Sequence, residues 1–139
     1  MVSAAVEADA EAVGRLLAEA GVIVVTGGRE GVAAAASRGA MEAGGLTVGI
    51  LPGRDRDEAN PWVRVAVPTG LGEMRNALVV MDADAVIAFP GAYGTLTEIA
   101  FALLADTRVV GLGTWALGDG VSILSAETPA DVVRLALDD

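Results

Sequence analysis

A glycine-bearing turn followed by a carboxylate is the part of the sequence best suited to chemistry. The turn, Pro90-Gly-Ala-Tyr-Gly94, joins an apolar predicted strand to a predicted helix, and Glu98 lies in the first turn of that helix. A helix N-terminus offers unpaired backbone N–H groups and a positive dipole end, and glycines let an anion come close to them. We therefore predict a phosphate-binding site here, with Glu98 as an acid beside it.

Glu98 also has a structural interpretation. The sequence Thr95-Leu-Thr-Glu98 matches a capping box, in which the glutamate reaches back to the backbone N–H of the first residue. The pattern Thr128-Pro-Ala-Asp131 is similar, with Thr128 as the predicted cap and Pro129 in the first helical position. Capping and chemistry both remain open for Glu98 at this point.

A second glycine-bearing loop follows the short apolar run at 22–25. Its glycines, Gly27, Gly28 and Gly31, either cradle a phosphate with backbone N–H groups or supply the positive φ of a tight turn. The loop has no G-x-G-x-x-G dinucleotide fingerprint. Because parallel strands bring their carboxyl ends to one edge of a sheet, both glycine-bearing loops are expected at the same edge.

The composition excludes several reaction classes. The 139 residues include no Cys, His or Lys, so Ser-His-Asp triads, thiol nucleophiles and Schiff bases cannot form. A zinc site built from His or Cys is excluded too, and we expect neither a metal nor an organic cofactor. The net charge of −10 argues against nucleic acid or an anionic membrane as a partner. Chemistry must then depend on carboxylates, arginines, hydroxyls and backbone N–H groups.

Apolar periodicity predicts a single α/β domain with alternating helices and short buried strands, which favours a parallel sheet covered on both faces. No signal peptide or membrane span is expected, and a cytoplasmic location follows. The predicted helix over 95–105 is apolar nearly all round and is expected to be covered. The predicted helices are 6–20, 32–43, 71–82, 95–105 and one opening at 128, and the predicted strands are 22–25, 46–51, 63–67, 85–89 and 108–112.

The helix predicted over 71–82 carries an apolar face and an arginine. Leu71, Met74, Leu78 and Met81 lie at helical spacing, and we expect this face to pack in the core, with a dimer interface as the alternative. Arg75 lies between two of these apolar positions, where an arginine usually covers apolar neighbours with its stem.

These segments together resemble the Lonely Guy (LOG) family. Pro90-Gly-Ala-Tyr-Gly-Thr-Leu-Thr-Glu98 is similar to its P-G-G-x-G-T-x-x-E signature, with Ala92 in place of a glycine. The likeness extends through Gly27-Gly-Arg-Glu-Gly31, Asn60-Pro61 and Thr69-Gly-Leu-Gly-Glu-Met-Arg-Asn76. The resemblance implies a single nucleotide-binding domain over residues 1–139, in a Rossmann-like three-layer fold. It also implies a homodimer or a higher homo-oligomer.

The resemblance further implies hydrolysis of the N-glycosidic bond of a nucleoside 5′-monophosphate, releasing the base and ribose 5-phosphate. Arg75 and Glu98 match the family's catalytic pair. The residues that match its nucleotide- and phosphate-binding positions are Gly27, Gly28, Gly31, Asn76, Pro90, Gly91, Gly94 and Thr95. The label "lysine decarboxylase-like" that the family carries is rejected for this chain, because pyridoxal phosphate needs a lysine.

One feature of the sequence favours a particular branch of the family, and a second predicts an altered sheet. Arg75-Asn76, preceded by Gly72-Glu-Met, is closer to the branch that contains molybdenum cofactor carrier proteins, so a non-catalytic carrier of a phosphorylated ligand is the alternative function. Family members also begin with a strand ahead of the first helix, which is missing or very short in this sequence. That strand is central in a Rossmann-like order, so we expect a gap, a rearranged sheet or a place for a partner's strand.

Overall fold

The computed structural model describes residues 2–81 and 83–138. Helices and short strands alternate along this part of the chain, as the apolar pattern predicts. The α-helices are α1 (Ala4–Glu19), α2 (Val32–Glu42), α3 (Asn76–Met81), α4 (Tyr93–Leu104) and α5 (Pro129–Leu137), and the 3-10 helices are η1 (Arg56–Glu58) and η2 (Gly72–Arg75). The strands are β1 (Val24–Thr26), β2 (Thr47–Leu51), β3 (Val65–Pro68), β4 (Ala85–Ala88), β5 (Arg108–Gly111) and β6 (Ile123–Ser125).

All recorded strand pairs are parallel, because a helix or a long connection follows each strand before its neighbour begins. One sheet has the order β1-β2-β3, and Val25 lies opposite Val48 in it. The other has the order β4-β5-β6, and Val86 lies opposite Val109. This arrangement confirms the predicted Rossmann-like α/β fold.

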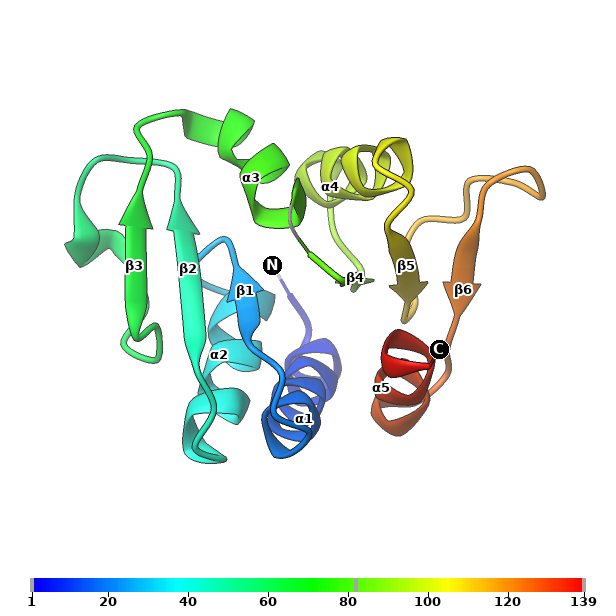
Figure 1. The fold of residues 1–139 in the computed structure, drawn as a ribbon, viewed down its shortest axis with the longest axis horizontal. Helices are drawn as coiled ribbons and strands as arrows, with labels where there is room; N and C mark the ends of the chain where they lie inside the picture. Colours follow the sequence, from blue (N-terminus) through cyan, green and yellow to red (C-terminus); the bar gives the residue numbers. More distant parts are fainter. Residues whose placement is uncertain (1, 82, 139) are drawn as a thin grey trace.

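Helices cover both faces of β4 and β5, whereas α1 and α2 cover only one face of the β1-β2-β3 sheet. The larger core cluster joins α1, α2 and α5 to β1, β4 and β5, while α3 and α4 pack together over a second cluster with β4 and β5. Figure 1 shows α4 and α5 on opposite sides of β4 and β5. The two clusters share no residue, so the core has two parts.

Helices α1 and α2 approach each other closely because glycines face each other's backbone. A Cβ at Gly14 would collide with the carbonyl oxygen of Ala36, and a Cβ at Gly39 would collide with that of Glu11. Small residues on both helices are therefore a condition of this contact.

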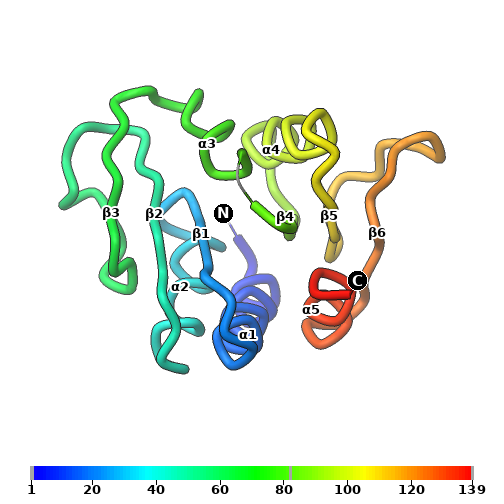
Figure 2. Tube along the Cα trace, viewed as in Figure 1, coloured from blue at the N-terminus to red at the C-terminus, as the bar shows by residue number. Residues whose placement is uncertain are grey.

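The two sheets are separated between β1 and β4. Neither strand has a recorded partner on the side that faces the other, among the described residues. Figures 1 and 2 show the separation. Of the three outcomes expected for a missing central strand, the structure has the gap.

Three local predictions are wrong. Helix α4 begins at Tyr93 with Ala92 as its N-cap, so Thr95 lies inside the helix and Thr95–Glu98 is no capping box. The prediction that this helix is covered also fails, since Phe101 and Leu104 are exposed. Strand β6 was not predicted, because it is only three residues long.

The segment predicted as one helix over 71–82 begins with the 3-10 turn η2 and continues as α3 up to Met81, and residue 82 lies outside the described residues. Its apolar face is exposed, so the expectation that this face packs in the core is wrong. None of the helices within residues 2–81 and 83–138 combines the length and the apolar character that a membrane span requires.

Candidate functional site

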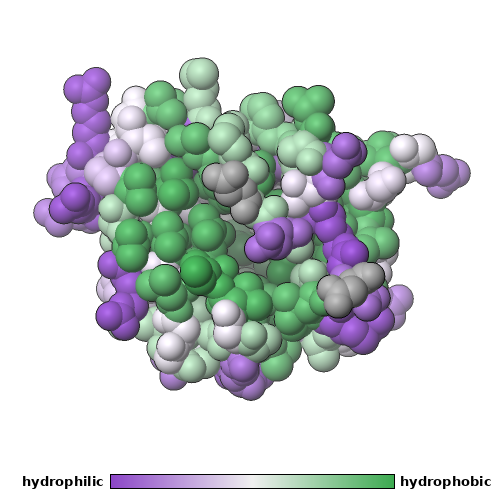
Figure 3. Space-filling model, viewed as in Figure 1, coloured by the Kyte–Doolittle hydropathy of each residue, from purple (hydrophilic) through white to green (hydrophobic). Residues whose placement is uncertain are grey.

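The separation between β1 and β4 is a cavity of about 610 Å³. Residues of both strands form its walls, α1 and α2 contribute Val13, Val32 and Ala36, and α3 and α4 close it from the other side. Figure 3 shows hydrophobic side chains gathered around a hollow at the centre of this face. The volume lies within the range of small-molecule sites.

Most of the residues predicted to bind or react lie at one end of this cavity, where the carboxyl ends of β1 and β4 are. Both glycine-bearing loops reach it, one after β1 and one after β4. The predicted site residues that line the cavity are Gly27, Arg75, Asn76, Pro90, Thr95 and Glu98.

The other four predicted residues do not line it. Gly28 is buried at a φ of 80°, where a Cβ would meet Leu51 and the backbone of Gly49, so it serves the turn. Gly31 lies beside a second, smaller cleft, next to Val2. A Cβ at Gly91 would collide with Thr95, and one at Gly94 would lie 3.6 Å from the amide nitrogen of Asn76. These glycines shape the loops that approach the cavity.

The two helices that follow the glycine-bearing loops have no side-chain cap. The N-caps of α2 and α4 are Gly31 and Ala92, and neither provides a capping hydrogen bond. Helices α1 and α5 are capped by the hydroxyls of Ser3 and Thr128. The predicted cap at Thr128 is thus confirmed. The N-terminal N–H groups of α2 and α4 are left without a side-chain acceptor and are suited to an anion.

Arg75 connects the loop after β1 to the neighbouring strand. Its Nε donates to the carbonyl oxygen of Ile50 over 2.9 Å, and its Nη2 reaches that of Gly27 at 3.5 Å. Its side chain is only 11% exposed. A Cβ at Gly27 would lie 2.8 Å from Nη2, so a larger residue there would push the guanidinium aside.

Asn76 continues this connection to α4. Its amide oxygen accepts from Arg75, and its amide nitrogen donates to the carbonyl oxygen of Gly94 and to the hydroxyl of Thr97. The side chain is buried. Arg75 and Asn76 together link the loop after β1 to the first turn of α4, across the cavity.

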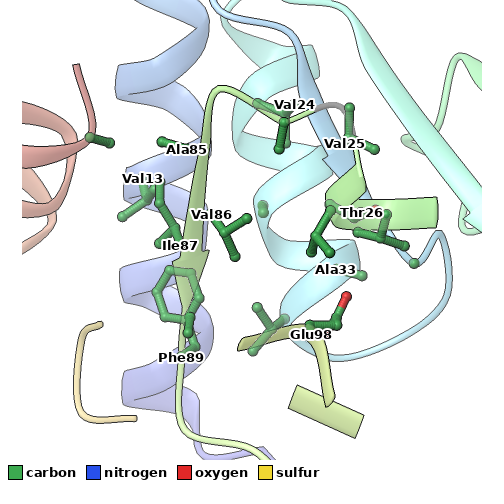
Figure 4. Close-up of a pocket in the computed structure, with 18 of the residues that line it drawn as sticks. Val13, Val24, Val25, Thr26, Ala33, Ala85, Val86, Ile87, Phe89 and Glu98 are labelled. Atoms are coloured by element: carbon green, nitrogen blue, oxygen red, sulfur yellow. The ribbon is translucent and has the colours of Figure 1, made fainter. Parts of the chain in front are cut away.

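Glu98 points into the cavity without a polar partner. Figure 4 shows its side chain on the side of Thr26 and Ala33. Among the described residues, none forms a hydrogen bond or an ion pair with its carboxyl. Burial raises the pKa of Glu98 from 4.5 to about 7, while the charge of Arg75 lowers it and that of Glu73 raises it further. This carboxyl can therefore exchange a proton near neutral pH.

Asn60 supports the loop after β1, a role that sequence reasoning did not assign to it. Its amide nitrogen donates to the carbonyl oxygens of Gly28 and Arg29, over 3.2 and 2.8 Å. Its backbone N–H also donates to Gly28. The partners lie about thirty residues apart in sequence, so no local pattern could reveal the contact.

The described residues contain no cluster of three side chains suited to holding a metal ion. The site consists instead of backbone N–H groups, one guanidinium and one carboxyl of raised pKa. Such a set can bind an anion and can give or accept a proton beside it.

Parallel sheets packed against helices, with glycine-bearing loops at the carboxyl ends of β1 and β4, define a Rossmann-like α/β protein. The chain belongs to the SLOG cluster4 family, whose model matches residues 2–134. It is 38% identical over 125 residues to an uncharacterized protein of Archaeoglobus fulgidus, covering 90% of this chain and 81% of that protein.

Solved structures with the same fold include two molybdenum cofactor proteins. The molybdenum cofactor binding protein of the phototrophic bacterium Rippkaea orientalis is 34% identical, with a TM-score of 0.91, covering 97% of this chain and 88% of that one. The molybdenum cofactor carrier protein of Chlamydomonas reinhardtii is 32% identical, with a TM-score of 0.84, covering 96% of this chain and 86% of that one.

Proposed function

We propose that this protein binds and carries a phosphorylated small molecule of the molybdenum cofactor type. The observation that carries the proposal is the pair of uncapped helix N-termini at one edge of the cavity, with Arg75 between their loops. One phosphate placed there meets N–H groups from two helices and a buried guanidinium nearby. The similarity to two molybdenum cofactor proteins supports the choice of ligand.

A pterin with a phosphate monoester, compared with its dephosphorylated form, tests this proposal by calorimetric titration. We expect the phosphorylated pterin to bind at least about tenfold more tightly, because a charge-assisted site contributes on the order of 1.4 kcal/mol or more. Equal affinities, or no binding of either form, would contradict the proposal.

Gly27→Ala provides a sharper form of the same test. The added methyl displaces the Arg75 guanidinium, which lies 2.8 Å from the Cβ position, so phosphate affinity should fall about tenfold. Gly120→Ala is the matched control, because its Cβ would enter open space. A loss of affinity in both variants would mean that the effect is not specific to the site.

A second candidate function is hydrolysis of the N-glycosidic bond of a nucleoside 5′-monophosphate. It is favoured by one observation, the cavity-facing Glu98 with a pKa of about 7. As a carboxylate, Glu98 would stabilise positive charge developing on the ribose or accept a proton from water. Arg75 would orient the phosphate or the ribose.

Incubation with AMP, GMP, CMP and UMP, followed by chromatography of free bases, separates the two functions. A hydrolase releases base from at least one nucleotide, and Glu98→Gln reduces that rate by at least about a hundredfold. A carrier binds its ligand and releases no base. An unchanged rate in Glu98→Gln would exclude the catalytic role of this residue.

We also propose that the protein forms a homodimer through the face of η2 and α3. Met74 is 76% exposed and Leu104, on the adjacent helix α4, is 83% exposed. Large exposed apolar side chains on neighbouring helices are typical of an interface. The expectation of a dimer interface, the alternative for this face, therefore stays a proposal.

A further inference from the structure

Two aromatic rings are stacked beside the anion-binding loop that follows β4. Tyr93, the first residue of α4, lies against Trp115, which follows β5. The ring centroids are 6.1 Å apart and the ring planes are inclined by 21°, which is the geometry of an offset stack. Tyr93 is 77% exposed, so Trp115 covers one face of its ring and the other face is open to solvent.

Contacts between two loops hold this pair in place. Because β4 and β5 are parallel and Ala88 lies opposite Gly111, both strands end at the same edge. The backbone N–H of Leu112 donates to the carbonyl oxygen of Ala88 over 2.9 Å, and the hydroxyl of Thr114 donates to that of Phe89 over 3.0 Å. The loop after β5 is thus fastened to the loop after β4.

The ring of Trp115 is fixed by the N-cap residue of α4. Its Nε1 donates to the carbonyl oxygen of Ala92 over 3.2 Å, and the same oxygen accepts from the backbone N–H of Leu96. Trp115 also packs against the core cluster of α3 and α4. The hydroxyl of Tyr93 forms no hydrogen bond with any of the described residues, so stacking holds this side chain. The pair therefore presents a firmly supported flat surface directly after Ala92.

The position of the pair relates it to a bound phosphate. The N–H groups in the first turn of α4 have no side-chain cap, and they belong to Tyr93 and the residues that follow it. A phosphate on these groups lies within one residue of the Tyr93 ring. A ring joined to that phosphate by a short linker can therefore reach the open face of Tyr93.

The cavity between β1 and β4 is a less suitable place for a polar ring. Much of its wall consists of apolar side chains such as Val24, Val86 and Ile87. A pterin carries several hydrogen-bonding groups around its edge, and burying these groups without partners is unfavourable. On Tyr93 the face of the ring is covered while its edge stays in water.

We propose that Tyr93, backed by Trp115, is the stacking surface for a flat conjugated ring in the phosphorylated ligand. The site then selects phosphate esters of fused heteroaromatic rings, such as a pterin, over phosphate esters without a ring. The loop holds the phosphate by charge-assisted hydrogen bonds, and Tyr93 holds the ring. This proposal rests on the proposed function and adds the residue that discriminates among phosphate esters.

Substitution of Tyr93 tests the proposal with two probes, the phosphate monoester of hydroxymethylpterin and glycerol phosphate. Tyr93→Leu replaces the ring by an apolar side chain that cannot stack, and Tyr93→Phe keeps a ring. In calorimetric titration, Tyr93→Leu should bind the pterin phosphate about tenfold more weakly, whereas Tyr93→Phe should retain the wild-type affinity. The affinity for glycerol phosphate should be the same in all three proteins.

Phe101→Leu is the matched control. It makes the same kind of change at an exposed aromatic residue of α4, about two helical turns from the loop. Its affinity for both probes should equal that of the wild type.

The single tyrosine of the sequence gives a direct signature of stacking. With isotope-labelled tyrosine, only the ring of Tyr93 is observed by nuclear magnetic resonance. The pterin phosphate should shift these ring signals upfield, because a conjugated ring lies over them, and glycerol phosphate should not. Labelled tryptophan supplies an internal reference, since Trp62, the other tryptophan, lies beside the second cleft and should not respond.

Three outcomes overturn this proposal alone. In the first, Tyr93→Leu binds the pterin phosphate as tightly as the wild type does. In the second, it loses affinity for both probes to the same extent, as general damage to the loop would cause. In the third, sedimentation shows that Tyr93→Leu changes the oligomeric state, which would assign the pair to a contact between copies. If the wild type binds neither probe, the stacking surface and the proposed function both fail.

Discussion

At the scale of single residues, Glu98 determines how the site responds to pH. Burial raises its pKa above the ordinary value of 4.5, to about 7, so the folded protein holds this proton more tightly than the unfolded chain does. The stabilisation linked to the bound proton is complete below pH 4.5 and is lost as the pH rises to about 7. Above that pH the buried carboxylate destabilises the fold by about 3 kcal/mol.

Glu98→Gln should remove this pH dependence. Glutamine stays neutral, so the variant should match the wild type at pH 4.5 and exceed its free energy of unfolding at pH 8 by up to about 3 kcal/mol. Urea denaturation at the two pH values measures the difference. Glu127→Gln, at an exposed site, is the control and should keep the pH dependence of the wild type. The same offset at both pH values would show that Glu98 does not titrate in this range.

The negative charge of ionised Glu98 also affects the affinity for a phosphorylated ligand. A phosphate bound at the N-terminus of α4 lies close to Glu98, and an ionised carboxylate repels it. Phosphate affinity should therefore fall as the pH rises through about 7, and Glu98→Gln should remove most of this decrease. Titration of the wild type and the variant with the phosphorylated pterin at pH 6 and pH 8 checks the prediction. An equal decrease in both would assign the effect to another group.

At the scale of elements, the contact between α1 and α2 depends on two glycines. Gly14→Ala and Gly39→Ala place a methyl against the backbone of the other helix, and backbone cannot move aside as a side chain can. We expect each variant to lose about 1–3 kcal/mol of stability.

A glycine-to-alanine change inside a helix otherwise stabilises it, by about 0.5–1 kcal/mol. Gly94→Ala in α4 is a suitable control, because its Cβ would make only an ordinary contact at 3.6 Å. Chemical denaturation of the three variants shows whether each substitution raises or lowers the free energy of unfolding. A gain in stability in all three would mean that α1 and α2 can move apart at no cost.

The sequence predicts elements well where a local signal exists and poorly where the partner is distant. Apolar runs located five of the six strands, and Thr128 marked the start of α5, since both signals lie within a few residues. The capping-box prediction at Thr95 is wrong because the same four-residue pattern can also occur inside a helix. The support of Gly28 by Asn60 stayed hidden, because tertiary structure alone brings them together.

The sequence predicts which residues gather at the candidate site better than it predicts how they are arranged there. Six of its ten residues line the cavity, since both loops were expected at one edge of the sheet. The apolar face of η2 and α3 was wrongly assigned to the core, because apolar spacing on a helix does not distinguish a core face from an interface.

At the scale of the whole molecule, the exposed helix faces predict self-association. Met74→Glu combined with Leu104→Glu should convert a dimer into a monomer, because it places four charges in the interface of the two copies. Sedimentation velocity measures the change. Leu117→Glu, at an exposed apolar residue in the loop between β5 and β6, is the control and should leave the dimer intact. A monomeric wild type would contradict the proposed interface.

The link formed by Arg75 and Asn76 spans both halves of the molecule, from Gly27 to Gly94. These hydrogen bonds therefore couple the positions of the two anion-binding loops. A phosphate that contacts both loops would favour the arrangement in which the link is formed, and the link would favour the bound phosphate by the same amount. Ligand affinity and the stability of this link should thus be thermodynamically coupled, and each can serve as a reporter of the other.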